Sequence, residues 1–384
     1  MPNMIVFAER AGERTFAELP FGEIDQAILT QLVHLPFEAA LPNEASCATL
    51  EGLSQALSDI TANKVYEVLL RDRLKLLHVC GASARYGRLV VSAFVNDISH
   101  EDEMQFSAMC VALPEGRRAI CFRGTDLTLA GWKEDFNMAF AEPTPAQKRA
   151  VDYINQYASV PTIVLGHSKG GNLAVYGSAF CDPLVQCRIT QVYTNDGPGL
   201  ARASVESAPY QAVAERITSF LPQNSLVGVL LAHHEPYNVV YSRAIGILEH
   251  NPFSWVIEEE ADMFVRREEL SRTSKVMDAT LDGWLENMER EERRTFVDTL
   301  YQVLAASGTK TLGELVNNPK RSAEKMLRAT KDISPRARKV LRRCMASFFS
   351  TSAEVIVAKT AEVLGIAADP PEGEADPPTA EELA

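Results

Sequence analysis

The chain lacks the features that mark a membrane-spanning or secreted protein. Its 384 residues contain no run of 18 apolar residues, and the N-terminal segment is not a basic stretch followed by an apolar one. We therefore expect no transmembrane helix, no signal peptide and a cytoplasmic location. Hydrophobic residues make up 46% of the sequence, which is enough to build a large core, so the chain is expected to be globular.

Cysteine is scarce and is not spaced for a metal site or a disulfide framework. The seven cysteines are an odd number, are scattered along the chain and include no Cys-x-x-Cys pair. Most of them lie in apolar stretches, so reduced and buried thiols are expected. The sequence predicts no metal site and no cofactor.

Positive charge is in short supply, since 38 Lys and Arg face 51 Asp and Glu and the net charge is −13. This balance argues against a nucleic-acid partner. Residues 319–343 are a local exception with many Lys and Arg, which would suit an anionic membrane surface. A solvated helix face balanced by the acidic C-terminus explains the segment better, so any membrane contact is expected to be peripheral.

Short β-branched runs alternate with helical patterns up to about residue 258. Short turns join the first three predicted strands, which indicates antiparallel pairing, whereas helical segments separate the later ones, which indicates parallel pairing. The predicted strands are 89–98, 106–113, 118–124, 162–166, 189–196, 217–222 and 237–242. The pattern predicts an α/β fold with a mixed sheet flanked by helices.

The composition changes after this α/β domain, which we predict over residues 1–260. Apolar residues then recur at a spacing of three and four among many charges, which predicts an all-helical C-terminal region over 261–365. The last segment, 366–384, is acidic and rich in proline, and it is expected to be a disordered tail.

The motif with the clearest chemistry is Gly166-His167-Ser168-Lys169-Gly170. An apolar strand-like run, Ile163 to Leu165, precedes it, and apolar residues at helical spacing follow it. Gly-x-Ser-x-Gly at a strand-to-helix turn forms a nucleophile elbow, in which the glycines allow close packing and a strained backbone exposes the serine Oγ. We predict Ser168 as the nucleophile, with an ordinary glycine-rich turn as the alternative.

An elbow serine needs two N–H donors for the oxyanion that forms during acyl transfer. One donor is the residue after the nucleophile, here Lys169, and the other comes from a loop after an earlier strand. The turn Arg123-Gly124-Thr125 supplies that loop, so the backbone N–H of Thr125, with its hydroxyl, is the second candidate. The alternative is a plain turn with an arginine salt bridge.

The general base is expected after the last strand of the parallel sheet. His250 follows the predicted strand 237–242 and is the topological candidate. His233 and His234 precede that strand and are expected to cap or pack, while His167 is expected to line the elbow. His250 is therefore predicted as the base.

The acid that holds the base has two candidate positions. Asp196 ends the strand after the elbow helix, although it also suits an Asx turn before Gly197. The loop after strand 217–222 offers only Gln223, Asn224 and Ser225. Asn224 can accept a hydrogen bond from a ring N–H but carries no charge. On this interpretation Asp196 is the acid, and Asn224→Asp is expected to be neutral or activating.

Six ordered blocks now give a resemblance. The blocks are "CFRGTD", "GWKEDF", "GHSKGGNLA", "NDGPG", "LPQNSLVGVLL" and "HNPFSW". With "LPFGEIDQAILTQLVHL" near the N-terminus, they resemble the Mbeg1-like family, a domain of unknown function in the α/β-hydrolase superfamily that is similar to class 3 lipases. The resemblance extends to about residue 260.

The resemblance implies a lipase-like α/β-hydrolase domain over 1–260. It also implies Ser168 as nucleophile, Thr125 and Lys169 as oxyanion donors and His250 as base. In class 3 lipases the acid follows the penultimate strand, which corresponds here to the segment that contains Asn224. The chain departs from the family pattern at this point because it has no carboxylate there.

We expect a serine hydrolase that cleaves a carboxylic ester through an acyl-serine intermediate. A small-molecule ester, such as a lipid or another acyl ester, is the expected partner. The apolar residues of segment 127–136 suit either a lid or the core. The alternatives are an acyltransferase, or a catalytically weak or inactive scaffold that binds a protein partner or a membrane.

Overall fold

The computed structural model describes most of the chain up to residue 275 and a few residues beyond it. The described residues are 1–58, 68–99, 104–125, 138, 142–272, 274–275, 324–326, 328, 334–335 and 338–339. The segment 127–136, expected to form either a lid or part of the core, and the predicted tail 366–384 lie outside them. So do most of the predicted helical region and most of the basic segment 319–343.

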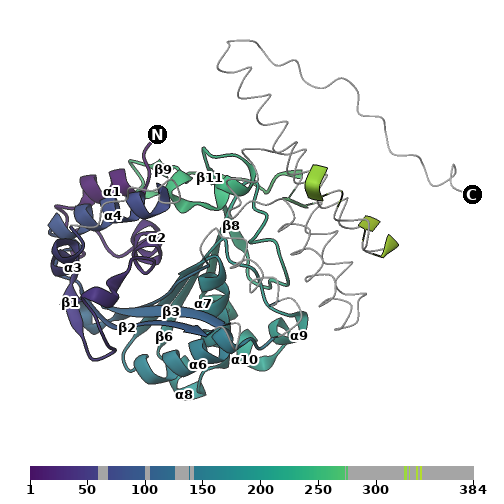
Figure 1. Ribbon diagram of the computed structural model, residues 1–384, viewed down its shortest axis with the longest axis horizontal. Coiled ribbons are helices and arrows are strands. Elements are labelled where there is room, and N and C mark those ends of the chain that lie inside the picture. The colour runs from purple at the N-terminus through teal and green to yellow at the C-terminus, as the bar shows by residue number, and fades with distance from the viewer. Residues whose placement is uncertain are drawn as a thin grey trace, which may run out of the picture.

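A nine-stranded sheet is the frame of the described part (Figure 1). The strands in spatial order are β1 (Cys47–Thr49), β2 (Val90–Ser99), β3 (Met104–Ala112), β4 (Arg118–Phe122), β5 (Thr162–His167), β6 (Ile189–Asn195), β7 (Ile217–Pro222), β8 (Tyr237–Val240) and β11 (Arg266–Arg267). Strands β1 to β4 pair antiparallel, β4 to β8 pair parallel, and β11 pairs antiparallel with β8.

The seven predicted strands and the change from antiparallel to parallel pairing are confirmed. Two further strands, β1 and β11, were not predicted, because two or three residues are too few to show an alternating pattern. Strand β11 lies beyond residue 260, so the sheet continues past the predicted end of the α/β domain. Two more short strands, β9 (Ile257–Glu258) and β10 (Met263–Phe264), pair with each other beside it.

Helices cover both faces of the sheet (Figure 1). Those against one face are α1 (Met4–Ala11), α2 (Glu23–Leu32), α3 (Leu50–Ala56) and α4 (Val68–Ala82). Those against the other are α6 (Pro145–Tyr157), α7 (Lys169–Phe180), α9 (Arg202–Val205) and α10 (Ala208–Gln211), with α8 (Pro183–Gln186) at the end of α7. Short 3₁₀ turns are η1 (Phe37–Ala39), η3 (Pro114–Gly116), η4 (Ala214–Arg216), η5 (Gly246–His250) and η6 (Pro252–Ser254).

The central strand β5 shows why the core has two halves. Side chains alternate across a strand, so Ile163 and Leu165 pack with the α1–α4 layer and Val164 packs with the α6–α7 layer. All six residues of β5 are buried. A strand buried on both faces reads as a continuous apolar run, which is how it stands in the sequence.

Helix α6 returns the chain from β4 to β5 and begins at a capping box. Thr144 Oγ1 accepts from the backbone N–H of Gln147 at 3.2 Å, and Gln147 Oε1 accepts from the backbone N–H of Thr144 at 2.8 Å. Because β4 to β7 run parallel, their carboxyl ends meet at one edge of the sheet. The residues that follow these strands are therefore brought together there.

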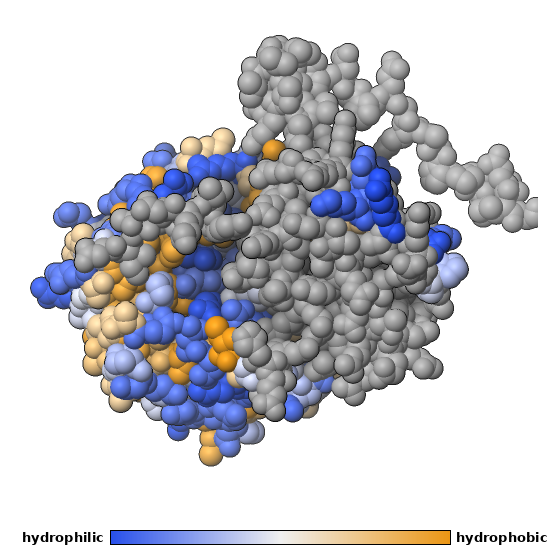
Figure 2. Space-filling model, viewed as in Figure 1, coloured by the Kyte–Doolittle hydropathy of each residue, from blue (hydrophilic) through white to orange (hydrophobic). Residues whose placement is uncertain are grey.

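The described surface is mixed in character. On the face shown in Figure 2, hydrophobic residues lie among hydrophilic ones. Large hydrophobic residues that are exposed among the described residues are Met1, Val6, Ile98, Leu184, Tyr237, Leu248 and Met263. In the same part of the chain, the helices are too short or too polar to cross a membrane.

Candidate active site

Ser168 occupies the turn between β5 and α7 in a strained backbone conformation. Its φ is 59° and its ψ is −133°, a region that side-chain-bearing residues rarely adopt. The flanking glycines make the turn possible. A Cβ on Gly166 would lie 2.0 Å from the carbonyl oxygen of Gly170, and one on Gly170 would lie 2.3 Å from that of Phe122. The sequence motif thus folds as a tight strand-to-helix turn packed against β4.

The loop after β4 packs directly on this turn. A Cβ on Gly124 would lie 2.4 Å from the carbonyl oxygen of His167 and 3.0 Å from Cβ of Ser168. Thr125 follows Gly124 and is buried. Lys169 is the first residue of α7, and N–H groups in the first turn of a helix point out of its N-terminus. The structure therefore places Lys169 directly after Ser168 and packs the loop that carries Thr125 against the elbow.

His250 and Asp196 are in contact, although 54 residues separate them. His250 Nδ1 lies 2.7 Å from Asp196 Oδ2, and both side chains are buried. A carboxylate only accepts, so Nδ1 donates this hydrogen bond, and in the neutral form of the ring Nε2 is then the acceptor. This is the tautomer that a general base needs on its outer nitrogen.

Other contacts fix the Asp196 carboxylate. Its Oδ1 accepts from the Ser225 hydroxyl and, at 3.0 Å, from the backbone N–H of Gly228. A Cβ on Gly228 would lie 2.5 Å from Oδ1, so this approach requires a glycine. Asp196 also has a φ of 48°, in the left-handed region that Asp tolerates better than most residues. Ser225 was not singled out as a site residue, because the sequence shows only that its loop lacks a carboxylate.

Asn224 has a different partner from the one expected. Its backbone N–H donates to Glu249 Oε2 at 3.1 Å, and its Nδ2 donates to Glu249 Oε1 at 2.7 Å. Asn224 therefore binds the residue before His250, whereas the imidazole binds Asp196. The sequence analysis missed Glu249, since a single glutamate carries no local signal of its burial or of its partner.

Glu249 is an unusual carboxyl group because it is only 1% exposed. Burial raises its pKa to about 7, and the negative charge of Asp196 adds to this increase. The hydrogen bonds from Asn224 act in the opposite direction. Glu249 therefore changes its charge near neutral pH, one residue from His250.

His167 lines the elbow and supports the histidine loop. Its Nε2 lies 2.8 Å from the carbonyl oxygen of His250, so Nε2 carries the proton, and the two rings lie 4.6 Å apart. Burial lowers the pKa of His167 well below its usual value, and nearby His250 contributes. The pKa of His34, whose ring lies 6.4 Å from that of His167, is also well below the usual value because of burial.

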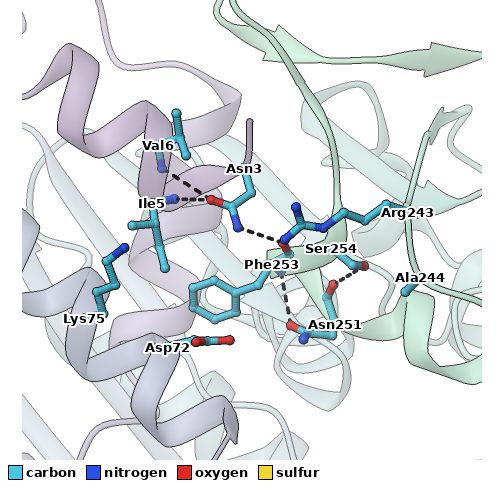
Figure 3. Close-up of a pocket in the computed structure, with 10 residues that line it drawn as sticks. All are labelled: Asn3, Ile5, Val6, Asp72, Lys75, Arg243, Ala244, Asn251, Phe253 and Ser254. Atoms are coloured by element: carbon cyan, nitrogen blue, oxygen red, sulfur yellow. Dashed lines mark hydrogen bonds between the residues drawn. The ribbon is translucent and has the colours of Figure 1, made fainter. Parts of the chain in front are cut away.

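A cavity of about 550 Å³ is lined in part by residues that follow His250 in the chain (Figure 3). Side chains from α1, α4 and the segment 243–254 line it, and none of the six predicted site residues does. The lining residues are Asn3, Ile5, Val6, Asp72, Lys75, Arg243, Ala244, Asn251, Phe253 and Ser254. Within the described part of the chain, no group of three or more His, Cys, Asp or Glu is placed to hold a metal ion.

The large mixed sheet, with helices on both faces, is an α/β fold. The chain belongs to the Mbeg1-like family, whose family model matches residues 80–302. This match begins and ends later than the resemblance over 19–260 noted in the sequence. No curated protein matches the chain.

Two solved structures of fungal lipases are similar to the chain. The Rhizomucor miehei lipase propeptide complex is 19% identical with a TM-score of 0.26, and the match covers 40% of this chain and 57% of that one. Lipase II from Rhizopus niveus is 13% identical with a TM-score of 0.28, and the match covers 51% of this chain and 83% of that one. The chain thus spans little more than half of the Rhizomucor chain.

Proposed function

We propose that the protein is a serine hydrolase that cleaves a carboxylic ester, of a lipid or another acyl compound, through an acyl-Ser168 intermediate. The observation that carries the proposal is the buried 2.7 Å contact between His250 and Asp196 at the sheet edge that holds Ser168. A serine at a strained elbow, an imidazole in the required tautomer and a fixed carboxylate are the parts of an acyl-transfer site.

The geometry supports a two-step reaction. Ser168 Oγ attacks the ester carbonyl carbon while His250 Nε2 takes the hydroxyl proton, and the imidazolium then returns this proton to the leaving alcohol. Water, activated by the same histidine, releases the acid from Ser168. Asp196 holds the ring and stabilises its positive charge. The backbone N–H groups of Thr125 and Lys169 stabilise the oxyanion in each step.

The inactive-scaffold alternative arose from the missing carboxylate at Asn224. The contact between Asp196 and His250 supplies a carboxylate from the neighbouring strand, which favours an active site. An acyltransferase would use the same first step, with an acceptor alcohol in place of water in the second. No described residue favours that acceptor over water.

The test is to label the protein with a fluorophosphonate, which reacts with an activated serine, and to assay it on nitrophenyl esters of different acyl lengths. We expect wild-type protein to be labelled at Ser168 and Ser168→Ala to lose labelling and about 10⁶-fold in turnover. Ser178→Ala is the control, because Ser178 is buried in α7 and its hydroxyl has no hydrogen-bond partner. Hydrolysis that survives Ser168→Ala would refute the proposal.

A further inference from the structure

Two loops at the carboxyl edge of the sheet hold the two carboxylates around His250. The loop after β7 binds Asp196 through Ser225 and Gly228, and it binds Glu249 through Asn224. Glu249 itself belongs to η5, the turn that ends at His250. One short loop therefore fixes both the partner of the imidazole and the residue before it.

The backbone on each side of the imidazole is also anchored. The carbonyl oxygen of Glu249 accepts from Trp255 Nε1 at 2.8 Å, and that of His250 accepts from His167 Nε2 at 2.8 Å. These two contacts tie η5 to the elbow and to η6. The link between Glu249 and Asn224 ties it to the loop that orients Asp196.

We propose that Glu249 is a positioning residue for His250: its ionised carboxylate, held by two N–H groups of Asn224, fastens the histidine turn to the loop that orients Asp196. The negative charge of Glu249 also favours the imidazolium that forms when His250 takes the serine proton. This inference rests on the proposed role of His250 as base. Glu249 lies beside Asn224, the position where the family pattern has its acid, but Glu249 belongs to the turn that carries His250.

The contact between Glu249 and Asn224 depends on pH because hydrogen bonds to an ionised carboxylate are about twice as strong as those to a neutral group. Among the described residues, the titratable group that acts on the Glu249 carboxyl is Asp196 at the end of β6, and His250 follows Glu249 on the same turn. Burial sets the pKa of Glu249 at about 7. The Glu249 carboxyl group is therefore mostly protonated at pH 6 and mostly ionised at pH 8, so its hydrogen bonds with Asn224 become stronger between these values.

The first experiment measures the second-order rate constant of fluorophosphonate labelling at Ser168 between pH 5.5 and 9. Glu249→Gln preserves the shape of the side chain but removes the charge. We expect labelling about tenfold slower at pH 8, with a smaller increase in rate from pH 6 to pH 8 than in wild type. Because wild-type protein must be labelled for either comparison, absence of labelling would contradict the proposed function itself.

Glu235→Gln is the matched control. Glu235 is also buried and accepts from Ser219 Oγ at 2.8 Å and from the Tyr210 hydroxyl, and its pKa is lowered to about 2. It is therefore ionised throughout the pH range. We expect the shape of the pH profile to be unchanged in this variant, even if the melting temperature falls.

The second experiment exchanges the two side chains. In the wild-type protein, Asn224 Nδ2 and Glu249 Oε1 lie 2.7 Å apart. Asn224→Asp alone places a second carboxyl group at this short distance, so we expect slower labelling and a lower melting temperature. The double variant Asn224→Asp with Glu249→Gln restores an amide-carboxylate pair of the same size and one negative charge. We expect the double variant to be labelled at a rate within about threefold of wild type. Such a recovery would show strong coupling between positions 224 and 249.

Two results would overturn the inference while leaving the proposed function intact. One is that Glu249→Gln labels at the wild-type rate with the wild-type pH profile. The other is that the double variant is no faster than the slower single variant, measured on folded protein with a cooperative melting transition. Labelling of wild-type Ser168 in the same experiment separates these outcomes from a failure of the proposed function.

Discussion

Asp196 illustrates at the scale of single residues how one carboxylate is given its role. Its two oxygens face different partners, with Oδ1 toward the Ser225 hydroxyl and the Gly228 N–H, and Oδ2 toward His250. The donors on Oδ1 fix the rotation of the carboxylate. Oδ2 is therefore left for the imidazole, and this arrangement makes a sharp prediction for an amide substitution.

We predict that Asp196→Asn lowers turnover by about 10⁴-fold with little change in melting temperature. The amide oxygen would keep the two donors on Oδ1, so the amide nitrogen would face His250 Nδ1. Two donors cannot share one hydrogen bond, so the ring proton would move to Nε2, the nitrogen that must receive the serine proton. Labelling and ester hydrolysis measure the loss.

Asp152→Asn, an exposed position on α6, is the control and should leave both rates unchanged. If Asp196→Asn keeps most of its activity, Asp196 is a turn residue and not the acid. The expectation for Asn224→Asp also changes at this scale. Because Asn224 faces the buried Glu249 carboxyl, an added charge there is now expected to slow the reaction, not to be neutral or activating.

At the scale of elements, the candidate site depends on how closely β4, β5 and α7 approach one another. The elbow packs against the end of β4, and Arg123 and Gly124, the two residues after β4, also contact the elbow. Small residues at the contacts allow this approach. The position of the oxyanion loop relative to Ser168 is therefore set by packing of backbone on backbone.

We predict that Gly124→Ala strongly slows labelling and hydrolysis. The new Cβ would lie 2.4 Å from the carbonyl oxygen of His167, which is backbone and cannot rotate away, so the loop that carries Thr125 must move. A displacement of about 1 Å at such a site costs on the order of 10²-fold in rate. Kinetics and melting temperature, measured together, separate a displaced loop from an unfolded protein.

Gly52→Ala is the comparison for this prediction. Gly52 lies in α3, and a Cβ there would meet only Thr49 Oγ1, at 3.4 Å, so no loss of rate is expected. If Gly124→Ala behaves like Gly52→Ala, the loop after β4 has room to adjust and does not hold the oxyanion donor in place.

For the whole molecule, the buried titratable groups predict how stability changes with pH. His34 and His167 have pKa values well below 6.5 in the folded state because of burial, so the unfolded chain binds their protons first as the pH falls. Their contribution to stability is thus present above pH 6.5 and is lost below it. Glu249 acts in the opposite sense, because burial raises its pKa to about 7 from an unfolded value near 4.5.

The unfolded chain takes up the two histidine protons as the pH falls below 6.5, and Glu249 offsets part of this effect. We predict that the free energy of unfolding falls as the pH is lowered below about 6.5, measured by urea denaturation at several pH values. His34→Phe removes one of the two histidines, and its unfolding free energy should depend much less on pH. An equally steep dependence in His34→Phe would show that His34 does not contribute.

The sequence by itself determined much of the sheet and the order of the site. Seven strands, their change from antiparallel to parallel pairing and the strand-to-helix turn at Ser168 all follow from local patterns. Once the strands are parallel, their carboxyl ends share an edge, so Thr125, Ser168 and Asp196 must lie near one another. These features depend on residues that are neighbours in the chain, which is why a single sequence shows them.

Only the tertiary structure decided how the residues of this edge pair. Asp196 binds His250 across 54 residues, and Asn224 binds Glu249 across 25, and no local pattern distinguishes these pairs from other choices. Short edge strands such as β11 were equally invisible, because they exist only through pairing with a neighbour. Burial of Glu249 and His167 also depends on the packing of distant loops. Partner choice and pKa are properties of the folded environment, and a chain of residue types does not carry them until it is folded.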